Sequence, residues 1–253
     1  MDFLKRKISN KNNELLDVWV EGNEKSEKTI IFVHGFATDK HETAGYFNGL
    51  VKALENKFRI IRFDFSGCGE SEGKLEEKDY EKWSEDLSVV ADYVRDNFQG
   101  DVYIFAQSMG CFVTALLSPS GIKKTVFTGV PNNNTQYIIE SLFLRFGKKP
   151  GGKIDFQGIS LLPRSTGKTQ KIGPSFWEVI KNLKPKETVE AYSKKTDLMI
   201  IHPKQDEVVG NQFLKEYSKI PGVKIKWLDG DHSFSKPEDR SKLIFEIERF
   251  FTV

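Results

Sequence analysis

Short apolar runs rich in β-branched and aromatic residues recur along this chain, and their order constrains the fold more than any other feature. They are TIIFVHG from Thr29, FRIIRFDF from Phe58, DVYIFAQ from Asp101, KTVFTGV from Lys124, DLMIIHP from Asp197 and VKIKWLDG from Val223. Runs that are apolar on both faces are typical of strands buried in a parallel sheet. Helical patterns separate them, such as the three- and four-residue spacing of Trp83, Leu87, Val90 and Val94. This alternation predicts an α/β fold with a mostly parallel central sheet flanked by helices.

Two more elements complete the expected domain. The stretch ELLDVWVEG from Glu14 alternates polar and apolar residues and predicts an antiparallel strand at the edge of the sheet. The last helix is predicted to begin at Pro237 and to bury Leu243, Ile244, Ile247 and Phe251. A chain of 253 residues with 38% hydrophobic content is long enough for one sizeable core. We therefore expect a single domain over residues 1–253.

Residues 131–186 interrupt the rhythm of strands and helices. They contain an amphipathic stretch, YIIESLFLRF, then a glycine-rich piece, GKKPGGKIDFQGISLLP, and then PSFWEVIKNL. This interval is too long for a bare loop between two strands. It predicts a lid insertion between the sixth and seventh strands, over the carboxyl edge of the sheet. The alternative is a surface insertion without a role in the site.

Charge and composition exclude several classes of partner. The 38 basic and 36 acidic residues leave a net charge of +2, and neither sign forms the long block of a nucleic-acid tail. No stretch approaches the roughly 18 apolar residues of a membrane span, and the start lacks a secretory signal. Clustered Cys/His spacing and His-Glu-x-x-His pairs are absent, so we expect neither metal nor cofactor. The expectation is a cytoplasmic protein whose two cysteines stay reduced.

Two serines compete for the role of nucleophile. The segment GESEG at residues 69–73 fits the serine-hydrolase pattern Gly-x-Ser-x-Gly, whereas AQSMG at residues 106–110 departs from it at Ala106. A nucleophilic serine needs a sharp turn between a strand and a helix, where backbone amides can stabilise an oxyanion. Ser71 lies between two glutamates with no strand before it. Ser108 follows the apolar run DVYIFAQ and precedes MGCFVTALL, so context favours Ser108.

A histidine base and an acid should follow other strands at the same edge of the sheet. His232, in WLDGDHSF, lies between the last apolar run and the last helix. Asp206, in HPKQDEVVG, lies on the loop after the penultimate run, with Glu207 and acids elsewhere as alternatives. For His34, His41 and His202 we expect structural or solvent-exposed roles.

The order Ser108, Asp206, His232, together with HGF at residues 34–36 and DFSGCGES at residues 64–71, resembles the α/β-hydrolase family over nearly the whole chain. The resemblance implies the α/β-hydrolase fold, an oxyanion hole made by the backbone N–H groups of Phe36 and Met109, and a scaffold turn at Ser71. Within the family, HGF, KIDFQG, IHPKQDEVV and GDHSF look most like small intracellular esterases of the cinnamoyl and feruloyl type.

These observations predict a serine carboxylic ester hydrolase that acts on small to medium acyl or aryl esters through an acyl-enzyme intermediate. The alternatives are a thioesterase or serine aminopeptidase with the same triad, and a ligand-binding protein without turnover. The lid aromatics expected to line the substrate pocket are Phe143, Phe146, Phe176 and Trp177. The lid's lysines and arginines predict a basic outer face that would favour anionic or phenolic substrates. Sequence leaves the natural substrate and the oligomeric state open, a homodimer being one option.

Overall fold

The computed structural model describes residues 3–164, 167–212 and 214–252. Within these ranges the main sheet has eight strands in the order β1-β2-β4-β3-β5-β6-β9-β10. Strands β3, β4, β5, β6, β9 and β10 are mutually parallel, and β1 and β2 are antiparallel additions. Their bounds are β1 Leu4–Ser9, β2 Leu15–Gly22, β3 Lys28–Val33, β4 Arg59–Phe63, β5 Asp101–Gln107, β6 Ile122–Thr128, β9 Asp197–Pro203 and β10 Lys224–Leu228. The predicted mostly parallel α/β sheet is confirmed.

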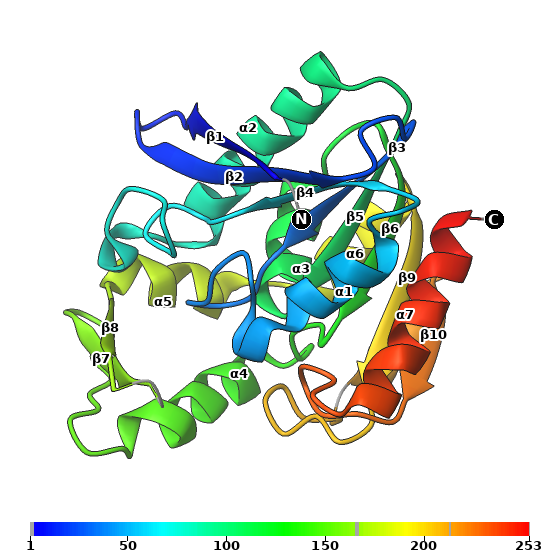
Figure 1. The fold of residues 1–253 in the computed structure, drawn as a ribbon. Helices are drawn as coiled ribbons and strands as arrows, with labels where there is room; N and C mark the ends of the chain where they lie inside the picture. Colours follow the sequence, from blue (N-terminus) through cyan, green and yellow to red (C-terminus); the bar gives the residue numbers. More distant parts are fainter. Residues whose placement is uncertain (1–2, 165–166, 213, 253) are drawn as a thin grey trace.

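Helices cover both faces of this sheet (Figure 1). One face carries α2 (Tyr80–Asn97), α3 (Met109–Leu117) and α6 (Pro185–Ser193). The other carries α1 (Tyr46–Leu54) and α7 (Pro237–Thr252). Short 3-10 turns lie at Thr43–Gly45 (η1), Leu75–Glu77 (η2) and Leu214–Lys219 (η4). The core therefore consists of two apolar layers separated by the sheet.

The longest helix on the first face shows how sequence sets these elements. The carboxylate of Asp79 caps α2 by accepting the N–H groups of Glu81 and Lys82. The predicted apolar face is then buried, with Trp83 and Leu87 completely enclosed. Phe98 ends the helix, and Gly100 follows with φ of 100°, a conformation that favours glycine.

One prediction about the sheet edge is wrong. The strand expected from Glu14 is present as β2 and is antiparallel, but it is not the edge, because β1 pairs along its outer side from Leu4 to Ser9. Most β1 side chains are exposed, so this strand carries no burial signal in the sequence. Its charged side chains suit an exposed edge, since charges oppose pairing with another chain.

The inserted segment between β6 and β9 has its own small architecture. It contains α4 (Thr135–Leu142), a π-helical turn η3 (Phe143–Gly147), a hairpin of β7 (Ser160–Pro163) and β8 (Thr169–Ile172), and α5 (Pro174–Asn182). In Figure 1 it lies at one end of the sheet, with the hairpin outermost. After the insertion, α6 begins at Pro185 and packs against α3.

No helix in the described ranges combines the length and the apolar character that a membrane crossing needs.

His202 is a histidine in the middle of the apolar sheet. It lies fully buried in β9, with its ring centroid 4.6 Å from that of Trp227. Both ring nitrogens lack a hydrogen-bond partner among the described residues. Burial lowers the pKa of His202 to about 4, against the opposing influence of the Asp206 carboxylate.

We predict that His202→Leu makes the protein less sensitive to mild acid. Between pH of about 6.5 and about 4 the unfolded chain binds a proton at His202 that the folded chain excludes, so wild-type stability falls as the pH falls. The difference corresponds to on the order of 3 kcal/mol. Urea unfolding at pH 7 and pH 4.5 measures it, with His41→Asn as a control at a partly exposed histidine. An equal loss of stability in His202→Leu and wild type would contradict the prediction.

Candidate active site

Ser108 occupies a sharp turn between β5 and α3. Its φ of 53° and ψ of −121° define a conformation that residues with a side chain rarely adopt. The Ser108 N–H donates to the Thr128 carbonyl (2.9 Å), and the Ser108 carbonyl accepts the Cys111 N–H (3.0 Å). The predicted strand, turn and helix are present, and they place Ser108 at the carboxyl end of β5 beside the N-terminus of a helix.

The turn requires a very close approach between α3 and β3. A Cβ atom at Gly110 would lie 2.5 Å from the Val33 carbonyl oxygen and 2.7 Å from that of His34. Both are backbone atoms, so only glycine fits at this position. Ala106, which departs from the usual glycine pattern, is fully buried in β5. The structure accommodates its single methyl group without losing the turn.

His232 and Asp206 are joined directly. The Nδ1 atom of His232 lies 2.8 Å from Oδ2 of Asp206, and the other carboxylate oxygen accepts the N–H groups of Val208 (2.9 Å) and Val209 (3.0 Å). Burial would raise the pKa of Asp206, but the imidazole and these amides outweigh it, so the pKa lies below its ordinary value. Asp206 is thus an ionised partner that favours the His232 tautomer with the proton on Nδ1.

Two contacts place His232 at the carboxyl ends of β5 and β6. Gln107, the last residue of β5, donates its side-chain amide to the His232 carbonyl (2.8 Å). Gly129 follows β6, and a Cβ atom there would lie 2.7 Å from Cε1 of the His232 ring. Ser108 and His232 line one cavity of about 60 Å³. The structure therefore brings together the three residues that the sequence predicts as a triad.

The expected oxyanion donors lie beside the same serine. Phe36 and Met109 both line a cavity with Ser108, and their backbone N–H groups have no acceptor among the described residues. Glu42 holds the Phe36 loop, because its carboxylate accepts the N–H groups of Gly35 and Thr43. No sequence pattern predicts this role of Glu42, because a polar loop separates it from the HGF motif.

His34 has a structural role that also serves this loop. Its Nε2 atom accepts the Phe65 N–H (3.0 Å), so the proton lies on Nδ1, which is 2.9 Å from the Gly35 carbonyl. His41 lies in a separate polar contact, with Nδ1 3.0 Å from the Asn48 side chain. Neither ring lines the cavities beside Ser108.

The competing serine, Ser71, is part of a turn that fixes the sheet. Its hydroxyl donates to the Asp64 carbonyl (2.6 Å) and accepts the Asp17 N–H (2.8 Å). These two bonds tie the loop after β4 to β2. The hydroxyl is already engaged in structure, as the interpretation of GESEG as a scaffold turn predicts.

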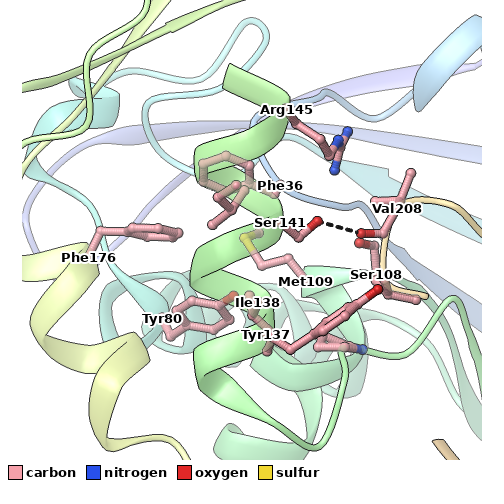
Figure 2. A pocket seen from close by; sticks show the side chains of 13 residues that line it. Phe36, Tyr80, Ser108, Met109, Tyr137, Ile138, Ser141, Arg145, Phe176 and Val208 are labelled. Carbon is pink, nitrogen blue, oxygen red and sulfur yellow. Dashed lines mark hydrogen bonds between the residues drawn. The ribbon is translucent and has the colours of Figure 1, made fainter. Parts of the chain in front are cut away.

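A narrow apolar cavity of about 70 Å³ opens at Ser108 (Figure 2). Its apolar lining comes from the core and from the insertion: Phe36, Tyr80, Met109, Ile138, Leu142 and Phe176. Ser108 and Arg145 belong to this cavity and also to the one that contains His232. Ser108 therefore lies between an apolar cavity and a more polar one.

The four aromatic residues expected in the pocket have different positions. Phe176 lines the apolar cavity, and Phe146 lines the polar one. Phe143 is 46% exposed and lines neither. Trp177 is fully buried and donates its Nε1–H to Ser160 (2.9 Å), which fixes the β7 strand to α5. Neither Phe143 nor Trp177 therefore lines the two cavities beside Ser108, since Phe143 faces solvent and Trp177 faces the insertion's own interior.

The same cavities contain two arginines that sequence analysis did not assign to the site. Arg145 lines both cavities, and Arg164, which was expected on the outer basic face of the insertion, lines the polar one. Ile138, Leu142 and Arg145 follow one another at helical spacing and so share one face of a helix. This spacing is the sequence pattern that could have placed Arg145 in the site. Figure 2 shows its guanidinium extending from η3 toward the side where Ser108 and Val208 lie.

No group of three or more His, Cys, Asp or Glu side chains in the described ranges is arranged to hold a metal ion.

Comparisons with known proteins agree with this fold. A family model described as alpha/beta hydrolase fold matches residues 28–152. Est1E from Butyrivibrio proteoclasticus, solved with ferulic acid bound, is similar with a TM-score of 0.76 and 21% identity over 98% of each chain. The Pyrococcus furiosus esterase Pf2001 has a TM-score of 0.73 and 19% identity over 99% of this chain and 90% of its own.

Among curated proteins, an uncharacterized protein of Acanthamoeba polyphaga mimivirus is 25% identical over 234 residues, which are 88% of this chain and 72% of the relative. The predicted resemblance is confirmed, and the chain has the α/β-hydrolase fold.

We predict that Gly110→Ala damages the site because its Cβ would collide with two backbone carbonyls. The helix must move away from β3, which separates Met109 from Phe36 and costs about 1–3 kcal/mol of stability. Urea unfolding and the rate of p-nitrophenyl acetate hydrolysis measure the two effects. Gly49→Ala is the control, because its nearest neighbours there are atoms of the flexible Arg240 side chain. A Gly110→Ala variant with wild-type stability and rate would show that the close approach is not needed.

Proposed function

We propose that this protein, a chain with the α/β-hydrolase fold, is a serine carboxylic ester hydrolase. The observation that carries the proposal is the convergence of Ser108, on its strained turn, with the bonded pair of His232 and Asp206. A nucleophile, a base and an acid that orients the base are the parts of a Ser-His-Asp triad.

The proposed reaction follows from the tautomer of His232. Its Nδ1 proton is held by Asp206, so Nε2 is free to take the proton of Ser108 as the hydroxyl attacks the ester carbonyl. The N–H groups of Phe36 and Met109 stabilise the negative charge on the carbonyl oxygen. His232 then gives the proton to the leaving alcohol. Water, activated by the same imidazole, hydrolyses the acyl-enzyme.

The apolar cavity supports a small to medium acyl or aryl group in the substrate. Tyr80 and Phe176 form its aromatic wall, with ring centroids 5.8 Å apart, and Phe36 packs 5.0 Å from Phe176. Since α4 and α5 supply part of the lining, we propose that the insertion acts as the lid that selects the acyl group. That Est1E was solved with ferulic acid is consistent with an aromatic acyl group.

We predict that Ser108→Ala lowers ester turnover by roughly 10⁴ to 10⁶, because the triad works as a unit. Ser71→Ala, the control, should keep most activity and lose on the order of 1–2 kcal/mol of stability with its two hydrogen bonds. p-Nitrophenyl esters of graded acyl length, methyl hydroxycinnamates, a matched thioester and an aminoacyl arylamide separate the ester from the thioesterase and aminopeptidase alternatives. A fluorophosphonate probe that fails to label Ser108 would favour a binding protein without turnover.

We predict a loss on the order of 10⁴ in turnover for Asp206→Asn with the fold retained. The asparagine carbonyl oxygen can still accept the Val208 and Val209 N–H groups, which leaves its NH₂ facing Nδ1 of His232. The imidazole must then accept a hydrogen bond at Nδ1 and carry its proton on Nε2. A protonated Nε2 cannot take the proton of Ser108. Glu207→Gln serves as the control. Wild-type turnover in Asp206→Asn would assign the acid to another residue.

A further inference from the structure

We propose that Arg145 and Arg164 form an anion subsite for the leaving-group side of the substrate. The preferred substrates are then esters whose alcohol carries a carboxylate or a phosphate. This inference rests on the proposed ester hydrolysis and adds the class of alcohol to it.

Both guanidinium groups lack a directly bonded acid, because Asp206 attracts Arg145 and Glu42 attracts Arg164 without forming an ion pair. Each stacks on a face of Phe146, with Cζ 5.1 Å (Arg145) and 5.3 Å (Arg164) from the ring centroid. Neither makes a hydrogen bond or ion pair with any side chain or carbonyl in the described part of the chain. Both are only partly exposed, and both line the cavity next to Ser108. Their N–H donors are therefore presented to whatever occupies that cavity.

The two buried arginines of the described ranges, by contrast, have hydrogen-bond partners for their guanidinium groups. Arg62 is bonded twice to the carboxylate of Glu21, and Arg59 donates to the carbonyls of Ser26 and Glu24. A buried charge normally needs partners of this kind, because desolvation without them is costly. Among the buried and partly exposed arginines in the described ranges, only Arg145 and Arg164 have guanidinium groups without a hydrogen bond to the protein.

Electrostatics make the pair receptive to an anion. Burial lowers the pKa of both arginines, and the charge of Arg164 lowers that of Arg145 further, so the two cations repel each other. Asp206 raises the pKa of Arg145 in part, and Glu42 raises that of Arg164. Both acids are already engaged, Glu42 by the Gly35 and Thr43 N–H groups and Asp206 by His232 and two backbone amides. An oxyanion between the guanidinium groups relieves the repulsion and accepts their N–H donors.

The position of His232 assigns this subsite to the alcohol. His232 must give its proton to the leaving oxygen, and it lines the cavity of the two arginines but not the apolar cavity. The alcohol therefore leaves on the arginine side, and the acyl group occupies the apolar side. The cavity has a volume of only about 60 Å³. It therefore favours an alcohol whose anionic group is only a few bonds from the ester oxygen.

The experiment compares esters of an anionic alcohol with esters of a neutral alcohol. O-Butyrylglycolate is measured against O-butyrylglycolamide, and 2-(phosphonooxy)ethyl butyrate against 2-methoxyethyl butyrate, so that the two arms distinguish carboxylate from phosphate. For the wild type we expect kcat/KM to favour an anionic member by about 10- to 100-fold, mainly through KM. In Arg145→Gln/Arg164→Gln this ratio should fall toward one.

The control is Lys149→Gln, which removes a third cation from the same Phe146 ring but not from the cavity. It should keep the wild-type ratio. The proposal is overturned if the wild type does not prefer either anionic ester, if the preference survives in the double variant, or if Lys149→Gln abolishes it equally. Preference for methyl hydrogen succinate over methyl succinamate instead would place the anion on the acyl side and overturn the assignment.

A binding measurement separates this proposal from the proposed function. If none of the esters is hydrolysed, ester hydrolysis is wrong, and calorimetric titration of Ser108→Ala with O-butyrylglycolate and O-butyrylglycolamide still tests the subsite. Tighter binding of the anion, lost in the Ser108→Ala/Arg145→Gln/Arg164→Gln variant, supports the anion site alone. Equal binding of the two compounds overturns it.

Discussion

The strained turn at Ser108 is the constraint on which the rest of the site depends. A serine with φ of 53° persists only where the surroundings fix it from several sides. Here β6 supplies the Thr128 carbonyl, and the carbonyls at the end of β3 lie so close to α3 that residue 110 must be glycine. The completely buried Cys111, Phe112 and Val113 anchor α3 against the sheet. The free energy stored in one residue is thus offset by packing across the domain.

Much of the fold could be predicted because buried parallel strands have a strong sequence pattern. The predicted runs at Asp101 and Asp197 coincide with β5 and β9, both apolar on two faces. Ser108, Asp206 and His232 could be predicted for the same reason, since each follows a strand and parallel strands end at one edge. The β1 strand could not, because its pairing depends on β2 and almost none of its surface is buried.

The insertion limited prediction because its faces depend on how it docks and on local helix geometry. The amphipathic stretch changes from α-helix to π-helix at Phe143, and the Lys148 N–H donates five residues back to the Phe143 carbonyl. The wider turn changes which side chains share a face. Phe143 faces solvent, whereas Arg145 and Phe146 face the cavity. The amphipathic pattern treats Phe143 and Phe146 as equivalent apolar positions, so sequence alone cannot separate them.

One hydrogen bond in the insertion has a mechanical consequence. The Ser141 hydroxyl on α4 donates to the Val208 carbonyl (3.0 Å; dashed in Figure 2), and the Val208 N–H donates to the carboxylate of Asp206. Outward movement of α4 must therefore either break the Ser141 bond or pull on the loop that orients the acid. The single residue Val208 therefore links the position of α4 to the carboxylate that orients His232.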